Sequence, residues 1–502
     1  MARQKVAIIG GGIAGLAAGC YLRMNGYDTE IFEMHTLPGG LCTAWTRKGY
    51  TFDFCIHWLI GSGPSKKWHA MWKDLGAIEG RKFIEWEVYE TVVLENKKRL
   101  TVYTDPDRFY DELAQFAPED KALCRSLCNA IKKAARFDFP IRRGKPGIVK
   151  TLVSIFKMLL FFPLLAKWGK MTLPQLIARF KSEELKQAFK LMYSEEVASD
   201  FPVTGMIVML AFMYAKSAGY PIGGSLEFAK AIERRYTALG GKIRYGFEVD
   251  KILVENGSAI GLAGNGGEVR KADIVISAAD GHATLFEMLE GKYLTSKISQ
   301  AYERLRVFPS LVYVCLGISR DLRSHPPMTA FTLSNPIRLE NGALMLKKLN
   351  LRLFHFDPSM APQGCTAAIV MVPTFNTSWW TDLRMQNPTD YNAEKRRIGE
   401  QIVDAIDEFL GDIRPHVEVI DVATPATIIR YTNNWKGSFE GFLPTRKSMS
   451  GRVIDRTIPS LKNFYMVGQW TNPGGGLPPC GMDGLAIAQR ICKEDGKMFK
   501  IK

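Results

Sequence analysis

The stretch Val6-Ala7-Ile8-Ile9-Gly10-Gly11-Gly12-Ile13-Ala14-Gly15 decides the fold that this sequence predicts. Its first four residues are an apolar run typical of a buried strand, and the residues from Leu16 to Arg23 are typical of a helix. Between them stands the pattern G-x-G-x-x-G, and a second strand-like run ends at the acidic residue Glu33, about 20 residues on. This combination predicts the first strand, turn and helix of a Rossmann-type dinucleotide-binding fold.

The three motif glycines and the acid that follows them have separate tasks in such a fold. Gly10 makes the tight turn, Gly12 lets backbone N–H groups approach a pyrophosphate, and Gly15 allows the helix and strand to pack closely. The helix N-terminus adds unpaired N–H groups and a partial positive charge. Glu33 can accept hydrogen bonds from the hydroxyls of an adenosine ribose and would repel a 2′-phosphate. The cofactor is therefore expected to be FAD or NAD rather than NADP.

Two further glycine-rich elements favour FAD. Pro38-Gly39-Gly40 lies just past Glu33, where the pyrophosphate and ribityl chain of a flavin would run. Near the other end of the chain, 464–468 reads as a buried strand that leads into the glycine-rich stretch 469–481, and a helix is expected from about Met482 to Cys492. A second strand, glycine turn and helix would hold the other half of a long cofactor, and its helix dipole would stabilise negative charge on a reduced flavin.

These motifs resemble those of the phytoene desaturase family, which also includes carotenoid isomerases and retinol saturases, all of them FAD-dependent. The resemblance rests on the opening glycine motif, Pro38-Gly39-Gly40, Gly49-Tyr50-Thr51-Phe52-Asp53, Tyr220-Pro221-Ile222-Gly223-Gly224 and Pro473-Gly474-Gly475-Gly476. Within it, Phe52-Asp53-Phe54-Cys55-Ile56-His57 is most similar to the retinol saturase branch. The resemblance implies an oxidoreductase that acts on a long apolar alkene or polyene, carotenoid- or retinoid-like. Hydride transfer at flavin N5 would then give desaturation, saturation or isomerisation.

The resemblance also implies which residues contact FAD, including Val249 on a strand that returns to the nucleotide-binding sheet. The expected contacts are Gly10, Gly12, Ile13, Ala14, Gly15, Glu33, Met34, Gly39, Gly40, Leu41, Val249, Gly468, Gln469, Gly476, Leu477, Gly481 and Met482. Two positions depart from the family pattern. Leu41 stands where many relatives have Arg, so a phosphate contact would need Arg47 or Lys48 instead, and Cys55 stands where relatives often have Gly.

The order of the motifs predicts an α/β protein with a discontinuous Rossmann-type FAD-binding domain, of the glutathione reductase-like kind. Residues 1–75, 215–290 and 425–502 are expected to form this domain. Residues 76–214 and 291–424 are expected to form an inserted mixed α+β substrate domain. Strand-like and helical runs in the second insertion stand at 311–317, 367–372 and 394–410.

Most of the net positive charge lies in the first insertion. The chain of 502 residues has a net charge of +15, and residues 121–190 contain 16 Lys or Arg but only 3 Asp or Glu. Within this block, 158–166 is apolar, too short for the ~20 residues that span a bilayer. Trp168 and the flanking lysines suit a lipid interface. The composition of residues 141–190 therefore predicts that this segment contacts an anionic membrane surface. The alternative is that the segment forms a lid on the substrate domain. Nucleic acid is disfavoured because aromatic stacking platforms are missing.

Composition and cysteine usage indicate where such a protein works. Hydrophobic residues make up 46% and charged residues 23% of the chain, which excludes disordered and collagen-like proteins. Its nine cysteines are irregularly spaced and no signal-peptide pattern opens the chain, so a reducing cytoplasm is expected. We expect no metal site. The protein is thus predicted to be peripheral, at the cytoplasmic face of a membrane.

Few side chains are candidates for catalysis. His57 could face the substrate as a proton donor, the alternative being a hydrogen-bonded core histidine, and Tyr431 could line the site. No second G-x-G-x-x-G is evident, so electrons are expected to be exchanged with an external donor or acceptor. Two other functions remain open at this point. One is a flavin amine oxidase-like enzyme, and the other is a non-catalytic flavin-bearing protein at the membrane surface.

Overall fold

A five-stranded parallel sheet holds the glycine motif at its centre. The computed structural model describes residues 4–137, 164, 166–193, 199, 201–445, 452–472 and 474–501. The strand order of this sheet is β10 (Lys242–Tyr245), β2 (Asp28–Glu33), β1 (Lys5–Ile9), β14 (Ile274–Ser277) and β20 (Phe464–Met466). All its pairs are parallel. Three distant parts of the sequence therefore build one sheet, as in a dinucleotide-binding fold.

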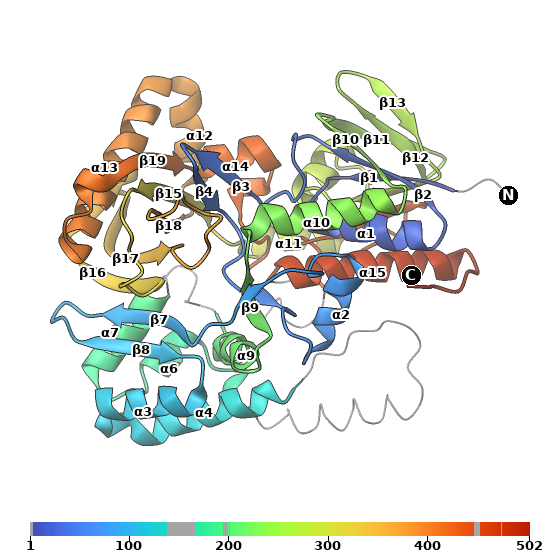
Figure 1. Ribbon diagram of the computed structural model, residues 1–502. Coiled ribbons are helices and arrows are strands. Elements are labelled where there is room, and N and C mark those ends of the chain that lie inside the picture. Colours follow the sequence, from blue (N-terminus) through green and yellow to red (C-terminus); the bar gives the residue numbers. More distant parts are fainter. Residues whose placement is uncertain are drawn as a thin grey trace.

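Helices and a small sheet cover this nucleotide-binding sheet. Helix α1 (Ile13–Met24) packs against α10 (Gly224–Ala238) and α15 (Leu477–Glu494). The three helices lie together in Figure 1. A separate three-stranded sheet packs onto β14 and contains β11 (Val249–Glu255), β12 (Ser258–Gly264) and β13 (Glu268–Lys271). The helix α1 is buried along almost its whole length because β1, α10 and α15 surround it.

The second large sheet of the structure is mixed and has seven strands. Its order is β19 (Val417–Ala423), β15 (Ser310–Ile318), β18 (Thr366–Thr374), β17 (Leu344–Leu353), β16 (Met328–Leu339), β7 (Val88–Val93) and β8 (Arg99–Tyr103). The pairs are antiparallel except for β16 with β7, which is parallel and joins the two insertions. The strand-like runs at 311–317 and 367–372 lie in β15 and β18.

Helices flank this sheet on its outer sides. On one side lie α12 (Thr377–Gln386), α13 (Pro388–Leu410) and α14 (Pro425–Thr432). Near β7 and β8 lie α3 (Pro106–Phe116), α4 (Lys121–Ala135), α6 (Leu173–Ile177), α7 (Glu183–Met192) and α9 (Val203–Tyr214), as Figure 1 shows. Helix α13 begins before the expected residue 394 because Asn387 caps it and Pro388 occupies its first turn.

Short strands and one buried acid connect the two sheets. These strands are β3 (Ala44–Arg47) with β4 (Tyr50–Asp53), and β5 (Leu59–Ile60) and β6 (Phe83–Ile84) on either side of β9 (Ala218–Pro221). Remaining helices are α2 (Lys67–Asp74) and α11 (Ser296–Arg304). Asp53 is buried and accepts hydrogen bonds from Ser225 N (2.9 Å) and the Tyr220 hydroxyl (3.1 Å). Asp53 thus ties β4 to β9 and to the start of α10.

The basic apolar segment 141–190 is described only in part. Residues 138–163 and 165 lie outside the described residues, so the amphipathic start of the segment is not among them. Trp168 is 2% exposed, and Lys167 Nζ donates to Ser126 Oγ of α4 at 2.5 Å. The expectation that the Trp168 indole lies at a lipid interface is therefore wrong. Among the helices that the structure describes, none has the length and apolar character needed to cross a membrane.

Candidate active site

One cavity of about 850 Å³ is lined by residues from both sheets. This volume lies toward the upper end of the range for small-molecule sites, about 300–1,000 Å³. The expected cofactor contacts that line it are Gly10, Gly12, Ile13, Ala14, Glu33, Met34, Gly39, Gly40, Leu41, Val249, Gly468, Gln469, Gly476 and Leu477. Gly15, Gly481 and Met482 are not among the lining residues. The structure thus brings both glycine-rich ends of the chain to one cavity.

The turn between β1 and α1 presents backbone to this cavity. Gly10 has φ +96°, a conformation that L side chains rarely adopt, and its N–H donates to Phe32 O at 2.8 Å. Gly12 faces open space, since a Cβ there would meet only Gly39 O, at 3.9 Å. A Cβ on Gly15 would lie 2.1 Å from Gly10 O, so Gly15 serves helix–strand packing instead. The first N–H groups of α1 have no acceptor within the helix and are suited to bind phosphate.

Glu33 stands at the end of β2 and fixes the turn beside it. One carboxylate oxygen accepts from Gly11 N at 2.6 Å and the other from His35 N at 2.8 Å. Its side chain is mostly buried and lines the cavity, as does Val249 at the start of β11. Each carboxylate oxygen has a second lone pair, so Glu33 can still accept from a ribose hydroxyl. The ribose contact itself stays a prediction.

The Pro38-Gly39-Gly40 turn lies against the first glycine turn. Gly39 N donates to Gly11 O at 2.9 Å. Gly39 has φ +109°, and a Cβ there would lie 2.2 Å from Cys42 O. Only glycine fits this position, because both the backbone conformation and the space exclude a side chain. Two backbone turns therefore face the same part of the cavity.

Helix α15 begins earlier in the sequence than expected. It begins at Leu477, five residues before the expected Met482, with Pro478 and Pro479 in its first turn. Prolines are tolerated there because the N–H groups of a first turn have no partner within the helix. The helix N-terminus is thus at Leu477, which lines the cavity, whereas a Cβ on Gly481 would meet Met71 Cε at 2.8 Å. Gly481 is therefore a packing contact with α2.

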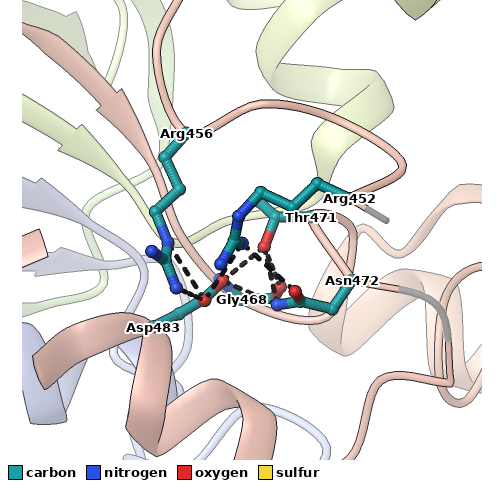
Figure 2. Close-up of polar contacts among 6 residues, drawn as sticks. All are labelled: Arg452, Arg456, Gly468, Thr471, Asn472 and Asp483. Atoms are coloured by element: carbon teal, nitrogen blue, oxygen red, sulfur yellow. Dashed lines mark hydrogen bonds and ion pairs between the residues drawn. The ribbon is translucent and has the colours of Figure 1, made fainter. Parts of the chain in front are cut away.

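A buried carboxylate holds the segment between β20 and α15, and the sequence reasoning missed it. Asp483 lies on α15, is 1% exposed, and lies close to the backbone of Gly468. As Figure 2 shows, its partners are Gly468 N (3.2 Å), Asn472 Nδ2 (3.1 Å), Arg456 Nε (3.1 Å), Arg452 Nη1 (3.4 Å) and the Thr471 hydroxyl. An acid among the apolar residues of the buried face of α15 was the available signal.

Two polar groups lie where the C-terminal glycines meet the cavity. Gln469 Nε2 donates to Asn434 Oδ1 at 3.3 Å, and both residues line the cavity. Glu440 also lines it, and burial raises the pKa of its carboxyl to about 8. Within the described residues this carboxyl has no hydrogen-bond partner. Sequence reasoning missed Glu440, because nothing in its neighbourhood marks it as buried.

His57 lies in the cavity wall, as one of the two sequence interpretations required. Arg352 Nη2 donates to its backbone carbonyl at 3.0 Å. Burial and the nearby Arg352 guanidinium hold the pKa of the His57 imidazole well below its usual range. The imidazole has no hydrogen bond to any described residue, so His57 is not a hydrogen-bonded core histidine. It is neutral at pH 7 and open to a ligand.

Tyr431 also lines the cavity, at a different part of its wall. Its side chain is 42% exposed and packs edge-on against His35, with ring centroids 5.1 Å apart. His35 lies two residues after Glu33, so Tyr431 belongs to the part of the cavity near the expected ribose site. Tyr431 thus lines the site, as the sequence suggested, and its role in catalysis stays a prediction.

The rest of the cavity wall is mostly apolar. It comes from β5, α2, β7, α7, α9 and the strands of the seven-stranded sheet. Its apolar and aromatic members are Trp58, Leu59, Ile60, Trp68, Tyr89, Met192, Phe201, Val208, Phe212, Phe308, Leu311, Met328, Met371 and Pro373. Such a wall suits a long apolar ligand beside the cofactor.

Comparison with known proteins agrees with a Rossmann-type dinucleotide-binding fold. A family described as an NAD(P)-binding Rossmann-like domain matches residues 8–75. A 4,4′-diapophytoene desaturase from Methylomonas sp is 24% identical, over 100% of this chain and 98% of its own length. A chloroplastic prolycopene isomerase from Daucus carota is 24% identical, over 97% of this chain and 80% of its own. The chain is a homologue of carotenoid desaturases and isomerases. A closer relation of this homologue to the retinol saturase branch stays a prediction.

Solved structures agree on the fold. An oxidoreductase from Methanosarcina mazei superposes with a TM-score of 0.62 at 17% identity, covering 97% of this chain and 100% of the other. A putative protoporphyrinogen oxidase from Exiguobacterium sp. superposes with a TM-score of 0.61 at 13% identity, covering 98% and 100%. The fold is thus the α/β fold of FAD-dependent oxidoreductases. The glycine turns and the homologues together support FAD as the cofactor of this carotenoid desaturase homologue.

Proposed function

We propose that this protein is an FAD-dependent oxidoreductase that acts on a long apolar alkene or polyene. One observation carries the proposal: a single cavity joins the glycine turns of both chain ends to an apolar wall on the seven-stranded sheet. The named homologues act on, or form, carotenoids. Bound FAD would supply hydride transfer at N5 of its ring system.

The residues around the cavity would bind the cofactor and orient the substrate. Backbone at Gly12, Gly39 and Gly468 would approach the cofactor closely, and the first turn of α15, at Leu477, would face it. The apolar wall would exclude water and hold the double bond against the flavin. His57 would hold or release a proton at a ring nitrogen, since its imidazole is neutral and has no partner among the described residues.

The direct test is the purified full-length protein. It should carry flavin absorbance and convert an added polyene, and mass spectrometry of the product identifies the reaction. Loss of two hydrogens marks desaturation, gain of two marks saturation, and altered absorbance at equal mass marks isomerisation. A protein that binds no flavin, or that oxidises amines and releases hydrogen peroxide instead, would overturn the proposal in favour of another function.

The same proposal includes an external electron partner and an anionic membrane surface. The excess of Lys and Arg in residues 121–190, and a substrate that dissolves in lipid, support work at a membrane. A second G-x-G-x-x-G that could hold a nicotinamide cofactor is not evident in the sequence, which supports electron exchange with a separate donor or acceptor. We place this activity at the cytoplasmic face because the cysteine pattern favours a reducing compartment.

A further inference from the structure

The apolar wall of the cavity contains one buried acid. Glu90 lies on β7, is 1% exposed and lines the cavity. Its Oε1 accepts a hydrogen bond from Asn350 Nδ2 at 2.9 Å. Its Oε2 is buried and has no partner among the described residues. A buried carboxyl oxygen without a partner is unfavourable unless a ligand or water supplies one.

A second unpartnered oxygen lies in the same wall. The Tyr193 hydroxyl is buried, lines the cavity and has no hydrogen-bond partner within the described part of the chain. Burial raises the pKa of Tyr193 well above its usual range, so the hydroxyl keeps its proton. It can therefore donate one hydrogen bond and accept another.

The register of the seven-stranded sheet explains how Glu90 and Asn350 meet. Ala330 of β16 pairs with Asn350 of β17 on one side and with Val92 of β7 on the other. The small side chain of Ala330 lets the Asn350 amide reach across β16 to Glu90. Asn350 and Arg352 share one face of β17, since side chains alternate along a strand. An Arg352 nitrogen, Nη1, is also buried without a partner, in a small adjoining pocket that His57 also lines.

We propose that Glu90, Tyr193 and Asn350 bind a hydroxyl group carried by an otherwise apolar substrate. This inference rests on the proposed function, because it names the class of substrate that the same cavity takes. A hydroxyl donates one hydrogen bond and accepts others, which matches the unpartnered oxygens of Glu90 and Tyr193.

Charged groups fit this cluster less well. The cationic side chains of Lys348 and Arg352 share the face of β17 with Asn350 and would repel an ammonium group. A carboxylate would bring a charge into this buried site, and its desolvation would be costly. Burial raises the pKa of Glu90 to about 8, so at pH 7 this carboxyl is mostly protonated and can donate to a neutral oxygen. A hydroxyl adds no charge to a buried site, which keeps its desolvation cost low.

The experiment compares three ligands that share one polyene chain. These are all-trans-retinol, the hydrocarbon in which hydrogen replaces its hydroxyl, and all-trans-retinoic acid. Binding to the full-length protein is measured by quenching of tryptophan fluorescence, since Trp58 and Trp68 line the cavity. The alcohol should bind about tenfold or more tightly than the hydrocarbon, as expected for a buried hydroxyl with satisfied hydrogen bonds.

Substitutions test whether the cluster of Glu90, Tyr193 and Asn350 causes the preference for the alcohol over the hydrocarbon. Glu90→Met and Tyr193→Phe should each bring the affinities for alcohol and hydrocarbon to within about threefold, with hydrocarbon binding unchanged. Glu90→Gln, which keeps a donor and an acceptor, should retain part of the preference. Glu95→Met is the matched control, because Glu95 is exposed in the turn that follows β7. Since Tyr193→Phe removes a single oxygen, it decides the question even if Glu90→Met does not fold.

Three results would overturn the inference. They are equal binding of alcohol and hydrocarbon to the unaltered protein, tighter binding of the acid than of the alcohol, or a preference that survives in both Glu90→Met and Tyr193→Phe. The first would mean that the cluster holds water only. None of these measurements requires turnover, so failure to find bound flavin or product would count against the proposed function alone.

Discussion

Gly12 and Gly15 belong to one motif, yet they tolerate a side chain very differently. Gly12 has φ −70° and ψ 176°, an ordinary extended conformation, and a Cβ there would point into open cavity. Gly15 lies in α1, where a Cβ would collide with Gly10 O. Gly12 is thus required by the ligand that occupies the cavity, and Gly15 is required by the packing of the fold itself.

We therefore predict opposite results for two substitutions. Gly12→Val should fold with nearly unchanged stability but contain less than about a tenth of the flavin, because its side chain occupies the expected pyrophosphate site. Gly15→Val should lose about 3 kcal/mol or more of stability through overpacking. Flavin absorbance per protein and chemical denaturation measure the two effects. Full flavin content in Gly12→Val would show that the cofactor does not lie at this turn.

His57 gives a prediction about pH. Its folded-state pKa lies well below the unfolded value of about 6.5, so the unfolded chain binds a proton that the folded chain does not. Stability from this group is therefore present above pH 6.5 and is lost as the pH falls. At pH 5.5 the loss is about 1 kcal/mol.

The measurement compares His57→Gln with the unaltered protein by denaturation at several pH values. Other buried groups, such as Glu90 and Asp280, titrate equally in both proteins and cancel in the difference. His57→Gln should lose about 1 kcal/mol less stability than the unaltered protein between pH 8 and pH 5.5. Parallel pH curves for the two proteins would mean that His57 is protonated as easily when folded as when unfolded.

At the scale of whole elements, local sequence signals located several strands but placed the starts of α13 and α15 too late and missed a sheet edge. The apolar runs predicted β1, β15 and β18 because burial on both faces leaves a continuous apolar pattern. The prolines at the start of α15 looked like a loop. The edge pair β7 and β8 was not predicted, since β7 pairs with β16 some 240 residues later and no local pattern reports such a partner.

The Asp483 cluster predicts how the C-terminal element depends on one side chain. Replacing Asp483 by Ala should destabilise the protein by about 3–5 kcal/mol, because Arg456 and the Gly468 N–H would remain largely buried without their acceptor. Flavin content should fall as well, since the Gly468 backbone lines the cavity. Thermal unfolding and flavin absorbance measure the two effects.

Arg490→Ala is the matched control for Asp483→Ala. It removes an ion pair from the same helix, with Glu494 at 2.7 Å, but both side chains are about half exposed. Its effect should stay within about 1 kcal/mol. If both variants lost the same small amount of stability, Asp483 would not be holding the β20–α15 segment.

At the scale of the whole molecule, the cofactor cradle was predictable and the substrate-binding wall was not. Glycine turns carry their constraint in the local sequence, so the sequence predicted both ends of the cradle. Glu90 and Asn350 are 260 residues apart and meet only because β7, β16 and β17 lie side by side. Likewise, Trp168 was misassigned because burial of an indole by residues distant in the sequence leaves no mark in the segment around it.

The uneven charge of the molecule supports one last prediction, that the protein binds anionic vesicles through its basic block. Residues 121–190 hold a net charge of +13, and an apolar substrate has to be taken from lipid. Each Lys or Arg near an anionic surface contributes about 1 kcal/mol at low salt. The variant replaces four lysines of the block by Gln: Lys150, Lys157, Lys167 and Lys170. Its affinity for phosphatidylserine-containing vesicles should fall about a hundredfold or more at low salt, and less at higher salt because the charges are screened.

The matched control removes the same charge elsewhere, by replacing the exposed lysines Lys242, Lys271, Lys462 and Lys493 with Gln. If net charge alone governed binding, both variants would lose affinity equally; if the basic block contacts the membrane, only the first should. Binding that survives in both variants would favour the alternative, in which residues 141–190 act as a lid over the substrate. Lys167 and Lys170 are not among the residues that line the cavity, so a membrane role predicts the same turnover in all three proteins for a substrate supplied in detergent. A membrane role thus predicts loss of activity with vesicle-bound substrate only, whereas a lid role predicts loss with both.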